Sequence, residues 1–539
     1  MTILNLRPEL ERHLHQRLQA FADGFRQNLV IIGPPGTGKT FQLQQLLVHQ
    51  PSRLLLIYCP LYRESCRSFL TRLLRSIIHS ALVPDGAAGA QGPEGGASGE
   101  LPDSLLQRLE GVCPRTGAAI QPIPGLISRR LFGEAFNRAL DVIPVLMEER
   151  GRPCVFILDE FLFLEEVGLV HAFHELGKRV MTWPSALFIL SSSSPYRARS
   201  ILRERLQLLF GQFELLALGT LERKVAHEWV HQELKGVRPG KDIAPFLIEW
   251  LGTYPWYLTV FLKRLRERAA LARSHQSAEP LFLQTAWDML GGPEGVLHQW
   301  CSSRMERLAS LRQGARAIEA LIQMAQGVRT TTDIGKRIGR MGLSEALQLL
   351  VEQDLAQRNG MCWVIGDPIV RCWLSTVLIE QRSGAGLDSG AVRERVDTYL
   401  RSLWSSWVAA QHLSFADQVV GLLSRFADDT VSLDFKTGRL PRFDAITAHQ
   451  QDLSGTPAYI VADSQGRRWC VTAQESALDE NAVAQFEAFC RTQAPKPARK
   501  VVITKGGLEQ NARLLAKATN MWVWEAEDLN VLLGLYGHA

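Results

Sequence analysis

Gly33-Pro34-Pro35-Gly36-Thr37-Gly38-Lys39-Thr40 matches the phosphate-binding pattern G-x-x-x-x-G-K-[ST] in full. The apolar residues 28–32 before it predict a buried parallel strand, and residues 41–47 after it predict a helix. Strand, loop and helix in this order let backbone N–H groups surround a phosphate at a helix N-terminus. We therefore expect the loop to bind ATP, with Lys39 on the β- and γ-phosphates and the Thr40 hydroxyl on Mg²⁺.

A second acidic motif ends the apolar run 154–158, where Asp159 and Glu160 follow directly. Asp159 lies 120 residues after Lys39, a separation that suits the two motifs of one P-loop ATPase. An aspartate also ends many buried strands without any catalytic role. With the phosphate loop present, we predict that Asp159 holds Mg²⁺ and that Glu160 polarises the attacking water.

A serine run, residues 191–194, follows the predicted strand 186–190. Ser192 or Ser193 is expected to contact the γ-phosphate or the lytic water, the alternative being a helix cap. The predicted helix 196–205 then carries four arginines, among which Arg205 is a candidate arginine finger for a neighbouring subunit; solvated or ion-paired arginines are the alternative. Residues 213–218 predict the strand that completes the sheet.

The length, charge and cysteine content of the chain limit the number of domains and the classes of ligand that are expected. The 539 residues suffice for three or four domains, and a net charge of +5 permits nucleic-acid binding without requiring it. The nine cysteines form no C-x-x-C pair, so no structural zinc site is expected. No apolar run is long enough for a membrane span, and the N-terminus lacks the form of a signal peptide, which predicts a soluble cytoplasmic protein without membrane contact.

Four segments are expected along the chain. Residues 1–220 form the ATPase core, in which 84–130 is a partly flexible insertion that is either a tolerated surface loop or a contact loop. Residues 221–304 form a helical lid, where Pro255 in the run Gly252–Leu258 is expected to lie over the nucleotide; a plain interhelical turn is the alternative.

Residues 305–382 predict a winged helix. Three helices, with Thr332 or Asp333 capping the second, precede a β-ribbon that turns at Asn359-Gly360. Basic residues cluster around the second helix: Arg329, Lys336, Arg337 and Arg340. They form either a DNA-phosphate contact or a solvated face of a packing module, and the sequence leaves both open.

The order of these motifs, followed by Asp367-Pro368-Ile369-Val370-Arg371-Cys372-Trp373, resembles the archaeal and bacterial ATPases of the MNS clade, which are related to the STAND and AAA+ ATPases. The resemblance implies an α/β fold with an AAA+-like P-loop ATPase core, a helical lid, a winged helix and a C-terminal restriction-endonuclease-like α/β domain over 383–539.

In such nuclease domains a glutamate on a helix, an aspartate on a strand and a Glu-x-Lys strand bind Mg²⁺. Glu394 and Asp444 match the first two, but Thr472, Ala473 and Gln474 replace Glu-x-Lys. The resemblance therefore implies a nuclease fold that has lost its chemistry, with a two-acid site of Asp444 and Glu475 as the alternative.

Three functions remain in view. The first is a Mg²⁺-dependent ATPase that forms homo-oligomers through its nucleotide sites, binds duplex DNA and acts in defence or in a mobile element. The second is an ATP-dependent nuclease. The third is a STAND-like signalling scaffold, switched by ATP, whose partner is a protein.

Overall fold

The computed structural model describes residues 6–49, 51, 53–83, 101–204, 212–237, 240–271, 277–384, 390–433, 436–449 and 458–537. It divides into two units, each described by itself below. The first unit comprises Met1–Glu233 and Thr253–Val260, and the second comprises Leu234–Gly252 and Phe261–Ala539.

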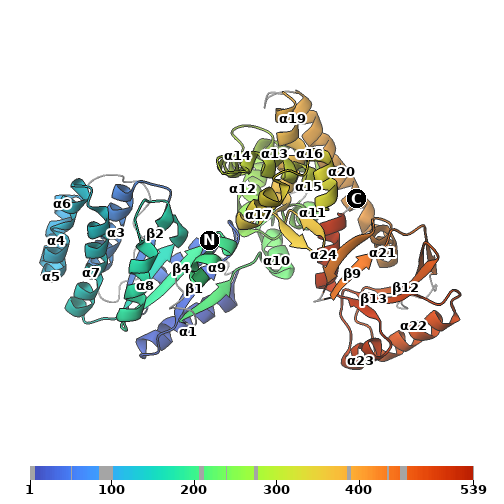
Figure 1. Ribbon diagram of the computed structural model, residues 1–539, viewed down its shortest axis with the longest axis horizontal. Coiled ribbons are helices and arrows are strands. Elements are labelled where there is room, and N and C mark those ends of the chain that lie inside the picture. The colour runs from blue at the N-terminus through green and yellow to red at the C-terminus, as the bar shows by residue number, and fades with distance from the viewer. Residues whose placement is uncertain are drawn as a thin grey trace. The chain divides into compact units, whose positions relative to one another are not determined.

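The first unit contains a parallel sheet with the strand order β2-β3-β4-β1-β5 (Figure 1). The strands are β1 (Asn28–Ile32), β2 (Leu55–Pro60), β3 (Cys154–Asp159), β4 (Ala186–Ser192) and β5 (Phe213–Ala217). Strands β1 to β4 are buried at every residue, as expected for parallel strands covered on both faces. Their carboxyl ends share one edge, so the phosphate loop, Asp159 and the serine run meet there.

Helices cover the two faces of this sheet. On one face α1 (Pro8–Ala22) and α2 (Lys39–Val48) share a core with Leu29 and Ile31 of β1. On the other face α3 (Cys66–Leu82), α7 (Phe132–Arg150), α8 (Ala172–Thr182) and α9 (Pro195–Glu204) share a core with Val30 and Ile32. The period-2 alternation of a strand thus divides its apolar side chains between two cores.

The predicted insertion is partly helical. Residues 84–100, its Gly/Ala-rich part, lie outside the described residues. The rest forms α4 (Asp103–Val112), α5 (Pro114–Ile120) and α6 (Ile123–Ser128), which pack on α3 and α7 through buried side chains that include Leu109, Ile120 and Ile123. This part therefore extends the core of the first unit. Helix α10 (Arg223–Glu233) also belongs to this unit.

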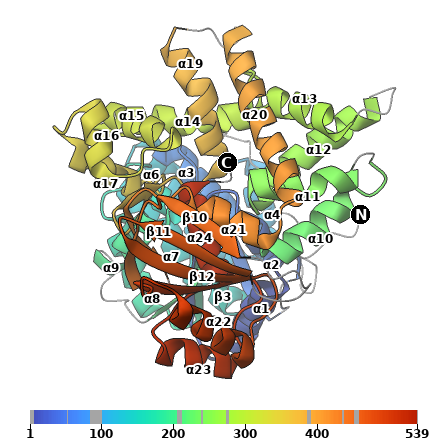
Figure 2. The same cartoon turned by 90° about the vertical axis from the view of Figure 1, so that its right-hand side faces the viewer.

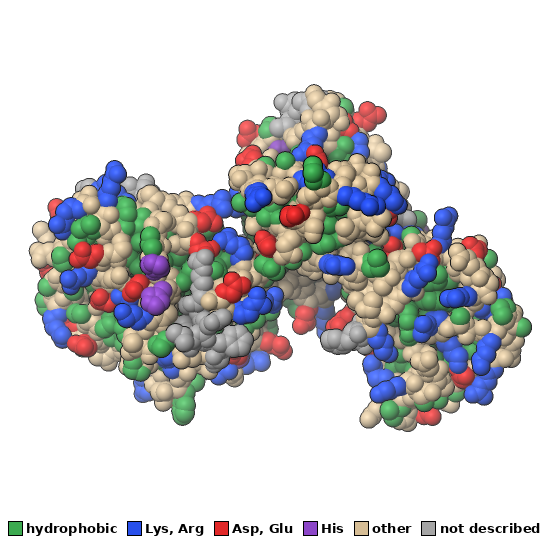
Figure 3. Space-filling model, in the orientation of Figure 1, with side chains coloured by type: hydrophobic (Ala, Val, Ile, Leu, Met, Phe, Trp, Pro, Cys, Tyr) green, Lys and Arg blue, Asp and Glu red, His purple; other side chains and the backbone are tan. Residues whose placement is uncertain are grey.

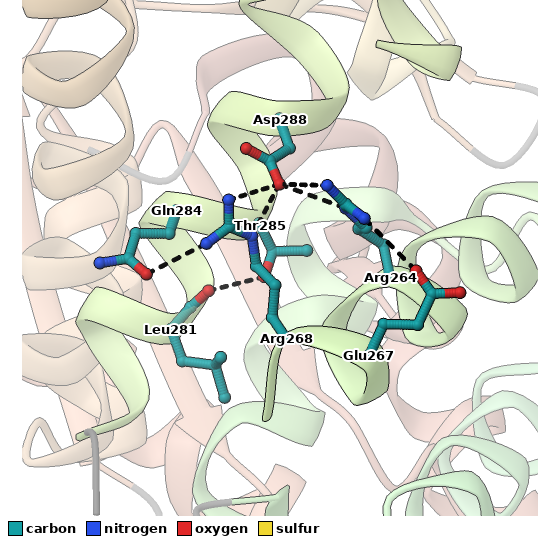
Figure 4. Close-up of polar contacts among 7 residues, drawn as sticks. All are labelled: Arg264, Glu267, Arg268, Leu281, Gln284, Thr285 and Asp288. Carbon is teal, nitrogen blue, oxygen red and sulfur yellow. Dashed lines mark hydrogen bonds and ion pairs between the residues drawn. The ribbon is translucent and has the colours of Figure 1, made fainter. Parts of the chain in front are cut away.

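Helices dominate the next part of the chain. They are α11 (Gly240–Leu251), α12 (Pro255–Leu271), α13 (Ala278–Leu290), α14 (Val296–Ala309), α18 (Pro368–Trp373), α19 (Ile379–Arg382) and α20 (Gly390–Gln411), with a π-helical turn at Leu374–Leu378. Within the second unit, α12 is joined to α13 by Asp288, whose Oδ2 accepts hydrogen bonds from both Arg264 and Arg268 (Figure 4). Glu267 also accepts from Arg264, so the charges of this network balance.

Three further helices and a hairpin follow in the order expected for 305–382. They are α15 (Gly314–Ala325), α16 (Thr331–Ile338), α17 (Leu343–Glu352), β6 (Gln357–Asn359) and β7 (Cys362–Val364). The cap of α16 differs from the expectation: Thr330 is the N-cap residue, and its hydroxyl accepts from the Asp333 N–H. The extended backbone of Thr330, which also bridges to Cys362, places its hydroxyl there.

The C-terminal part contains a five-stranded sheet with the order β10-β11-β12-β13-β14. Its strands are β10 (Ala445–His449), β11 (Ala458–Ser464), β12 (Arg467–Gln474), β13 (Arg499–Thr504) and β14 (Trp522–Trp524), the first three antiparallel and the last three parallel. Helices α21 (Phe415–Leu423) and α24 (Ala526–Tyr536) cover one face, and α22 (Glu480–Thr492) and α23 (Gln510–Ala518) cover the other (Figure 2). A separate hairpin pairs β8 (Asp429–Leu433) with β9 (Lys436–Leu440).

Two findings concern the chain more broadly. Throughout the described ranges, no helix combines the length and the hydropathy that crossing a bilayer requires. All nine cysteines are free and buried.

Candidate nucleotide site

The phosphate loop has the backbone conformation that its glycines allow. Gly36 and Gly38 have φ angles of +79° and +91°, and α2 begins at Lys39 directly after them. The Lys39 side chain is 4% exposed, and its ammonium group donates to the carbonyl oxygens of Gly33 and Pro34 at 2.9 and 3.0 Å. The loop thus holds Lys39 beside its own backbone at the helix N-terminus.

The Asp159 carboxylate accepts hydrogen bonds from hydroxyl groups on three neighbouring segments. Its Oδ2 accepts from Thr40 Oγ1 at 2.7 Å and from Tyr58 Oη at 2.9 Å, and its Oδ1 accepts from Ser191 Oγ. The contact between Thr40 and Asp159 confirms that the two predicted metal ligands lie side by side. Tyr58 and Ser191 were not predicted, because their roles depend on β2 and β4 flanking β3 in the sheet.

Glu160 lies beside Ser193. Its carboxylate accepts from the Ser193 hydroxyl and, at 2.9 Å, from the Ser193 N–H. Its own N–H donates to Ser191 Oγ at 3.1 Å, and its φ of +59° is unusual for a residue other than glycine. Burial raises the pKa of Glu160, while Lys39 and the two hydrogen bonds from Ser193 act in the opposite direction.

The pKa of Lys39 shifts in the opposite direction to that of Glu160. Burial lowers the pKa of its ammonium group, and the negative charges of Glu160 and Asp159 oppose that shift. The three side chains therefore form one electrostatically coupled cluster at the carboxyl edge of the sheet.

Other residues that were predicted to lie near the nucleotide form no hydrogen bond with Asp159 or Glu160 in the part of the chain that the structure describes. The Ser192 hydroxyl accepts from the Ser194 N–H, a local turn before α9, and has no hydrogen bond to either acid. On α9, Arg197 forms an ion pair with Glu165 at 2.6 Å. Arg205 lies outside the described residues.

The predicted lid segment contacts the phosphate loop within the first unit. The N–H of Trp256, the second residue of α12, donates to the Gly36 carbonyl at 3.1 Å, and a Cβ added to Gly36 would lie 3.1 Å from the Trp256 Cβ. Pro255 occupies the first position of the helix, where its missing N–H costs nothing. This close approach brings the start of α12 to the loop that is expected to bind phosphate.

The residues at this edge fit ATP and Mg²⁺. Thr40 and Asp159 supply two hard oxygen ligands 2.7 Å apart, and Mg²⁺ commonly takes few protein ligands besides phosphates and water. No cluster of three or more metal-ligating His, Cys, Asp or Glu side chains occurs among the residues that the structure describes. Lys39 and the N–H groups at the start of α2 supply the complementary positive charge for phosphates.

The four residues predicted to bind DNA do not form one surface. Arg329 is partly buried, stacks on the Tyr536 ring at 4.4 Å and forms an ion pair with Asp429 at 3.4 Å. The exposed Lys336 pairs with Asp333 at 2.7 Å, while Arg337 and Arg340 are exposed. Arg329 therefore packs within the protein and is not a phosphate contact.

The residues of the degenerate nuclease site are also separated. Strand pairing aligns Ala445 with Asp463 and Asp463 with Arg468, so Asp444 lies at the end of the sheet where β12 begins. Glu475 follows β12 at the opposite end, about 23 Å along the strand, and pairs with Lys505. The two-acid site of Asp444 and Glu475 is therefore wrong.

Glu394, the remaining residue of that set, is exposed on α20. This helix packs on α13 and on the π-helical turn, and its Trp404 contacts Phe246 and Phe282. Glu394 therefore belongs to the helical part of the second unit and does not join Asp444.

The run Asp367–Trp373 has a structural role. Asp367 caps α18 by accepting from the N–H groups of Ile369 and Val370, and it forms an ion pair with the largely buried Arg304 at 3.1 Å. The buried Trp373 donates its indole N–H to His298. These contacts tie α18 to α14 and explain the residues without invoking a ligand.

Comparison with known proteins identifies the first part of the chain. Residues 7–185 match the family model described as an AAA ATPase domain. This match spans the phosphate loop, Asp159 at the end of β3 and Glu160 directly after it. The chain therefore contains an AAA ATPase domain in its first unit.

Solved structures give weaker similarities. The Walker-type ATPase PABY2304 of Pyrococcus abyssi is 16% identical, with a TM-score of 0.43, covering 68% of this chain and 95% of that one. The ORC2 protein of Aeropyrum pernix, in ADPNP–ADP complexes, is 14% identical with a TM-score of 0.44, covering 75% and 95%. The RuvB Holliday junction branch migration motor of Thermotoga maritima is 13% identical with a TM-score of 0.31, covering 71% and 99%. No curated protein matches the chain.

Proposed function

We propose that this chain hydrolyses ATP in a Mg²⁺-dependent reaction at the carboxyl edge of the first sheet. The observation that supports this most directly is the cluster of Lys39, Thr40, Asp159 and Glu160, which one edge brings within mutual electrostatic reach. The match of residues 7–185 to the AAA ATPase domain supports ATP as the nucleotide.

Each residue has a separate task in this proposal. Lys39 and the N–H groups at the start of α2 bind the phosphates, and Thr40 with Asp159 holds Mg²⁺, which neutralises charge on the phosphate oxygens. Glu160 accepts a proton from water as the water oxygen attacks the γ-phosphorus and the bond to the β-phosphate oxygen breaks. Ser193 holds the Glu160 carboxylate in place, so it acts as a positioning residue.

Substitution of Glu160 tests the reaction. Glu160→Gln keeps the shape of the side chain but removes its basicity, so we expect it to bind a fluorescent ATP analogue with near wild-type affinity and to release phosphate at least a hundredfold more slowly. Lys39→Ala should lose binding itself. The exposed Glu134→Gln on α7 is the matched control. Wild-type phosphate release by Glu160→Gln would remove the proposed base.

The proposal extends to assembly and to DNA. The order α15, α16, α17, β6, β7 supports a winged helix, and the αβ order of the C-terminal part supports a catalytically inactive restriction-endonuclease-like domain. Together with the sequence resemblance to the MNS clade, they support an ATPase that forms homo-oligomers and binds DNA in defence or mobile-element biology. A STAND-like signalling scaffold is the second candidate.

Light scattering after size exclusion separates these two candidates. Glu160→Gln should hold ATP without turnover, so it is examined with and without ATP–Mg²⁺ and duplex DNA. A large species that requires both ligands supports assembly on DNA. A large species formed with ATP alone favours the signalling scaffold, and a single unchanged size contradicts both.

A further inference from the structure

The tip of the β6–β7 hairpin is covered by the C-terminal part of the second unit. Asn359 exchanges two hydrogen bonds with the backbone of Ser432, at 2.7 and 3.1 Å, and the Met361 N–H donates to the Thr430 carbonyl at 2.9 Å. At Gly360, whose φ is +61°, an added Cβ would lie 2.3 Å from the Thr430 oxygen. The hairpin therefore pairs with β8 and leaves no room for a nucleic-acid groove at its tip.

The base of the hairpin is covered as well. Cys362 is fully buried in one core with Val431 and Leu532. Asp429 of β8 accepts from Tyr536 at 2.9 Å and pairs with Arg329. Much of the hairpin that would form the wing is thus engaged in internal packing, and Gln357, Arg358 and Met361 are its exposed side chains.

Helix α17, in the position of a recognition helix, is also poorly suited to DNA. Its sequence is Leu343-Ser344-Glu345-Ala346-Leu347-Gln348-Leu349-Leu350-Val351-Glu352, which contains two glutamates and no lysine or arginine. Contacts with DNA phosphates dominate the affinity of proteins for DNA. Helix α17 has no basic side chain that could contact a phosphate.

A different surface combines cations with aromatic rings. At the end of the C-terminal sheet where β12, β13 and β14 begin, the rings of Phe443, Trp469 and Trp522 form a continuous row, in which Trp469 is buried and the other two rings are partly buried. Phe443 and Trp469 have their centroids 5.5 Å apart, and Trp469 and Trp522 have theirs 5.6 Å apart. The Trp522 ring lies against the backbone of Gly438 in β9, which closes the row on that side.

Arginines lie at the same end of this part of the chain as the row, and one of them contacts a ring. Arg499, paired with Trp469 in the strand register, holds its guanidinium 4.1 Å from the centre of the Trp522 ring. Arg439 is 68% exposed and shares the Asp428 carboxylate with the backbone N–H of Arg442. Arg467 begins β12 on the same face of the strand as Trp469 and is exposed.

The charges at this end do not cancel. Four arginines (Arg439, Arg442, Arg467 and Arg499) and two aspartates (Asp428 and Asp444) belong to this end, and a fifth arginine, Arg468, is matched by Asp463 through two hydrogen bonds. Lysine and arginine side chains gather over the C-terminal part, orange to red in Figure 1, on the face that Figure 3 shows. Acidic and basic residues are nearly equal in number over 393–539, so the sequence alone gave no sign of this grouping.

We propose that the chain binds the phosphate backbone of nucleic acid on this arginine–aromatic surface (Arg439, Arg442, Arg467 and Arg499 around Phe443, Trp469 and Trp522) and not on its winged helix. Arginine suits this partner because its planar guanidinium forms paired hydrogen bonds with phosphate, and stacking on Trp522 fixes one such group in advance. The inference rests on the DNA-binding part of the proposed function and names its surface.

Two triple variants of the full-length chain test the inference, because each removes three positive charges. The surface variant is Arg439→Ala/Arg442→Ala/Arg467→Ala, and the matched variant around α16 is Lys336→Ala/Arg337→Ala/Arg340→Ala. Fluorescence anisotropy with a labelled 30-mer, as a duplex and as a single strand, is measured between about 50 and 200 mM salt. Phosphate release and the melting temperature confirm that each variant folds.

The expected result is a loss of at least tenfold in affinity for the surface variant and less than threefold for the α16 variant. The slope of log affinity against log salt should also decrease by about two to three for the surface variant alone. Stronger binding of the single strand or of the duplex identifies the form of the nucleic acid. Arg499→Lys keeps the positive charge but loses the planar guanidinium group. Its affinity for the oligonucleotide should lie between those of the wild type and the triple surface variant.

Other results overturn the inference. If the α16 variant loses as much affinity as the surface variant, or more, the winged helix is the interface and the proposed DNA binding still stands. If the wild-type chain binds neither oligonucleotide at about 50 mM salt, the DNA-binding part of the proposed function fails and the inference fails with it.

Discussion

At the scale of single residues, Asp159 shows how much of the site depends on the sheet. Three hydroxyl groups, from Thr40, Tyr58 and Ser191, donate to one buried carboxylate. Asp159 and Thr40 were predictable because both belong to motifs with fixed spacing. Tyr58 was not, since only the pairing of β2 with β3, which aligns Pro60 with Asp159, brings its hydroxyl there.

Tyr58→Phe tests this contact. The variant removes a hydrogen bond to a charged group, which is worth about 1.5–3 kcal/mol, and leaves Asp159 less firmly held beside Thr40. We expect the Mg²⁺ concentration for half-maximal phosphate release to rise severalfold, with little change in the affinity for Mg²⁺-free nucleotide. Tyr62→Phe, a change in a more exposed ring nearby, is the control. Equal effects from both substitutions would argue against a specific role for Tyr58.

Glu160 should impose a pH dependence on hydrolysis. Burial raises its pKa above the ordinary value of about 4.3, and the Ser193 hydrogen bonds limit that rise by stabilising the charged form. Activity should therefore fall as the pH decreases through the raised pKa, and Ser193→Ala should move this acid limb to higher pH. The contribution of Glu160 to folding stability has the opposite dependence on pH: it is complete below about pH 4.3 and is lost as the pH rises through the raised folded-state pKa.

The pH–rate profile of phosphate release measures this shift. Ser192→Ala is the control, because the Ser192 hydroxyl accepts from the Ser194 N–H and has no hydrogen bond to Glu160. A Ser193→Ala profile with an unchanged or lowered acid limb would show that Ser193 does not stabilise the ionised carboxylate.

At the scale of secondary-structure elements, local patterns were sufficient for some features and insufficient for others. Apolar runs predicted β1, β3, β4 and β5 of the first sheet to within two residues at either end. The first three of these are buried along their whole length, so each is a continuous apolar run. The residue types Asn359-Gly360 predicted a turn between β6 and β7, but the two-residue turn is Gly360-Met361, because Asn359 ends β6 and pairs with Cys362. The docking of this hairpin on β8 was not predictable, since Asn359 and Ser432 are 73 residues apart and no local pattern links them.

Asn359→Ala tests the docked hairpin. The substitution leaves the Ser432 N–H and carbonyl without their side-chain partner in a partly buried position. This should lower the free energy of unfolding by about 1–3 kcal/mol. We expect faster hydrogen exchange at the Ser432 amide and a lower melting temperature. Met361→Ala in the same turn removes a side chain that is 56% exposed and should change neither. Wild-type protection of Ser432 in Asn359→Ala would show that the hairpin does not depend on this contact.

At the scale of the whole molecule, the chain passes between its two units three times, and the last passage lies within a single helix. Helix α12 contributes Pro255–Val260 to the first unit and Phe261–Leu271 to the second. Its first turn contacts the phosphate loop through Trp256 and Gly36. The Gly-x-x-Pro pattern predicted a break and a new helix here, but not that the helix would be shared, because domain membership depends on packing far away in sequence.

A change in this helix should therefore separate hydrolysis from any response of the second unit. Two glycines inserted between Val260 and Phe261 leave the contact of Trp256 with Gly36 intact, but turn the remainder of α12 by about 200° and weaken the helix by about 1 kcal/mol per glycine. We expect phosphate release to stay within about twofold of wild type, while the dependence of assembly on ATP, measured by light scattering, is lost. The same insertion after Gly384, outside every helix of the second unit, should affect neither. If assembly of the α12 variant still requires ATP, then the response reaches the second unit without a continuous α12, and the nucleotide must act through subunit contacts of the first unit alone.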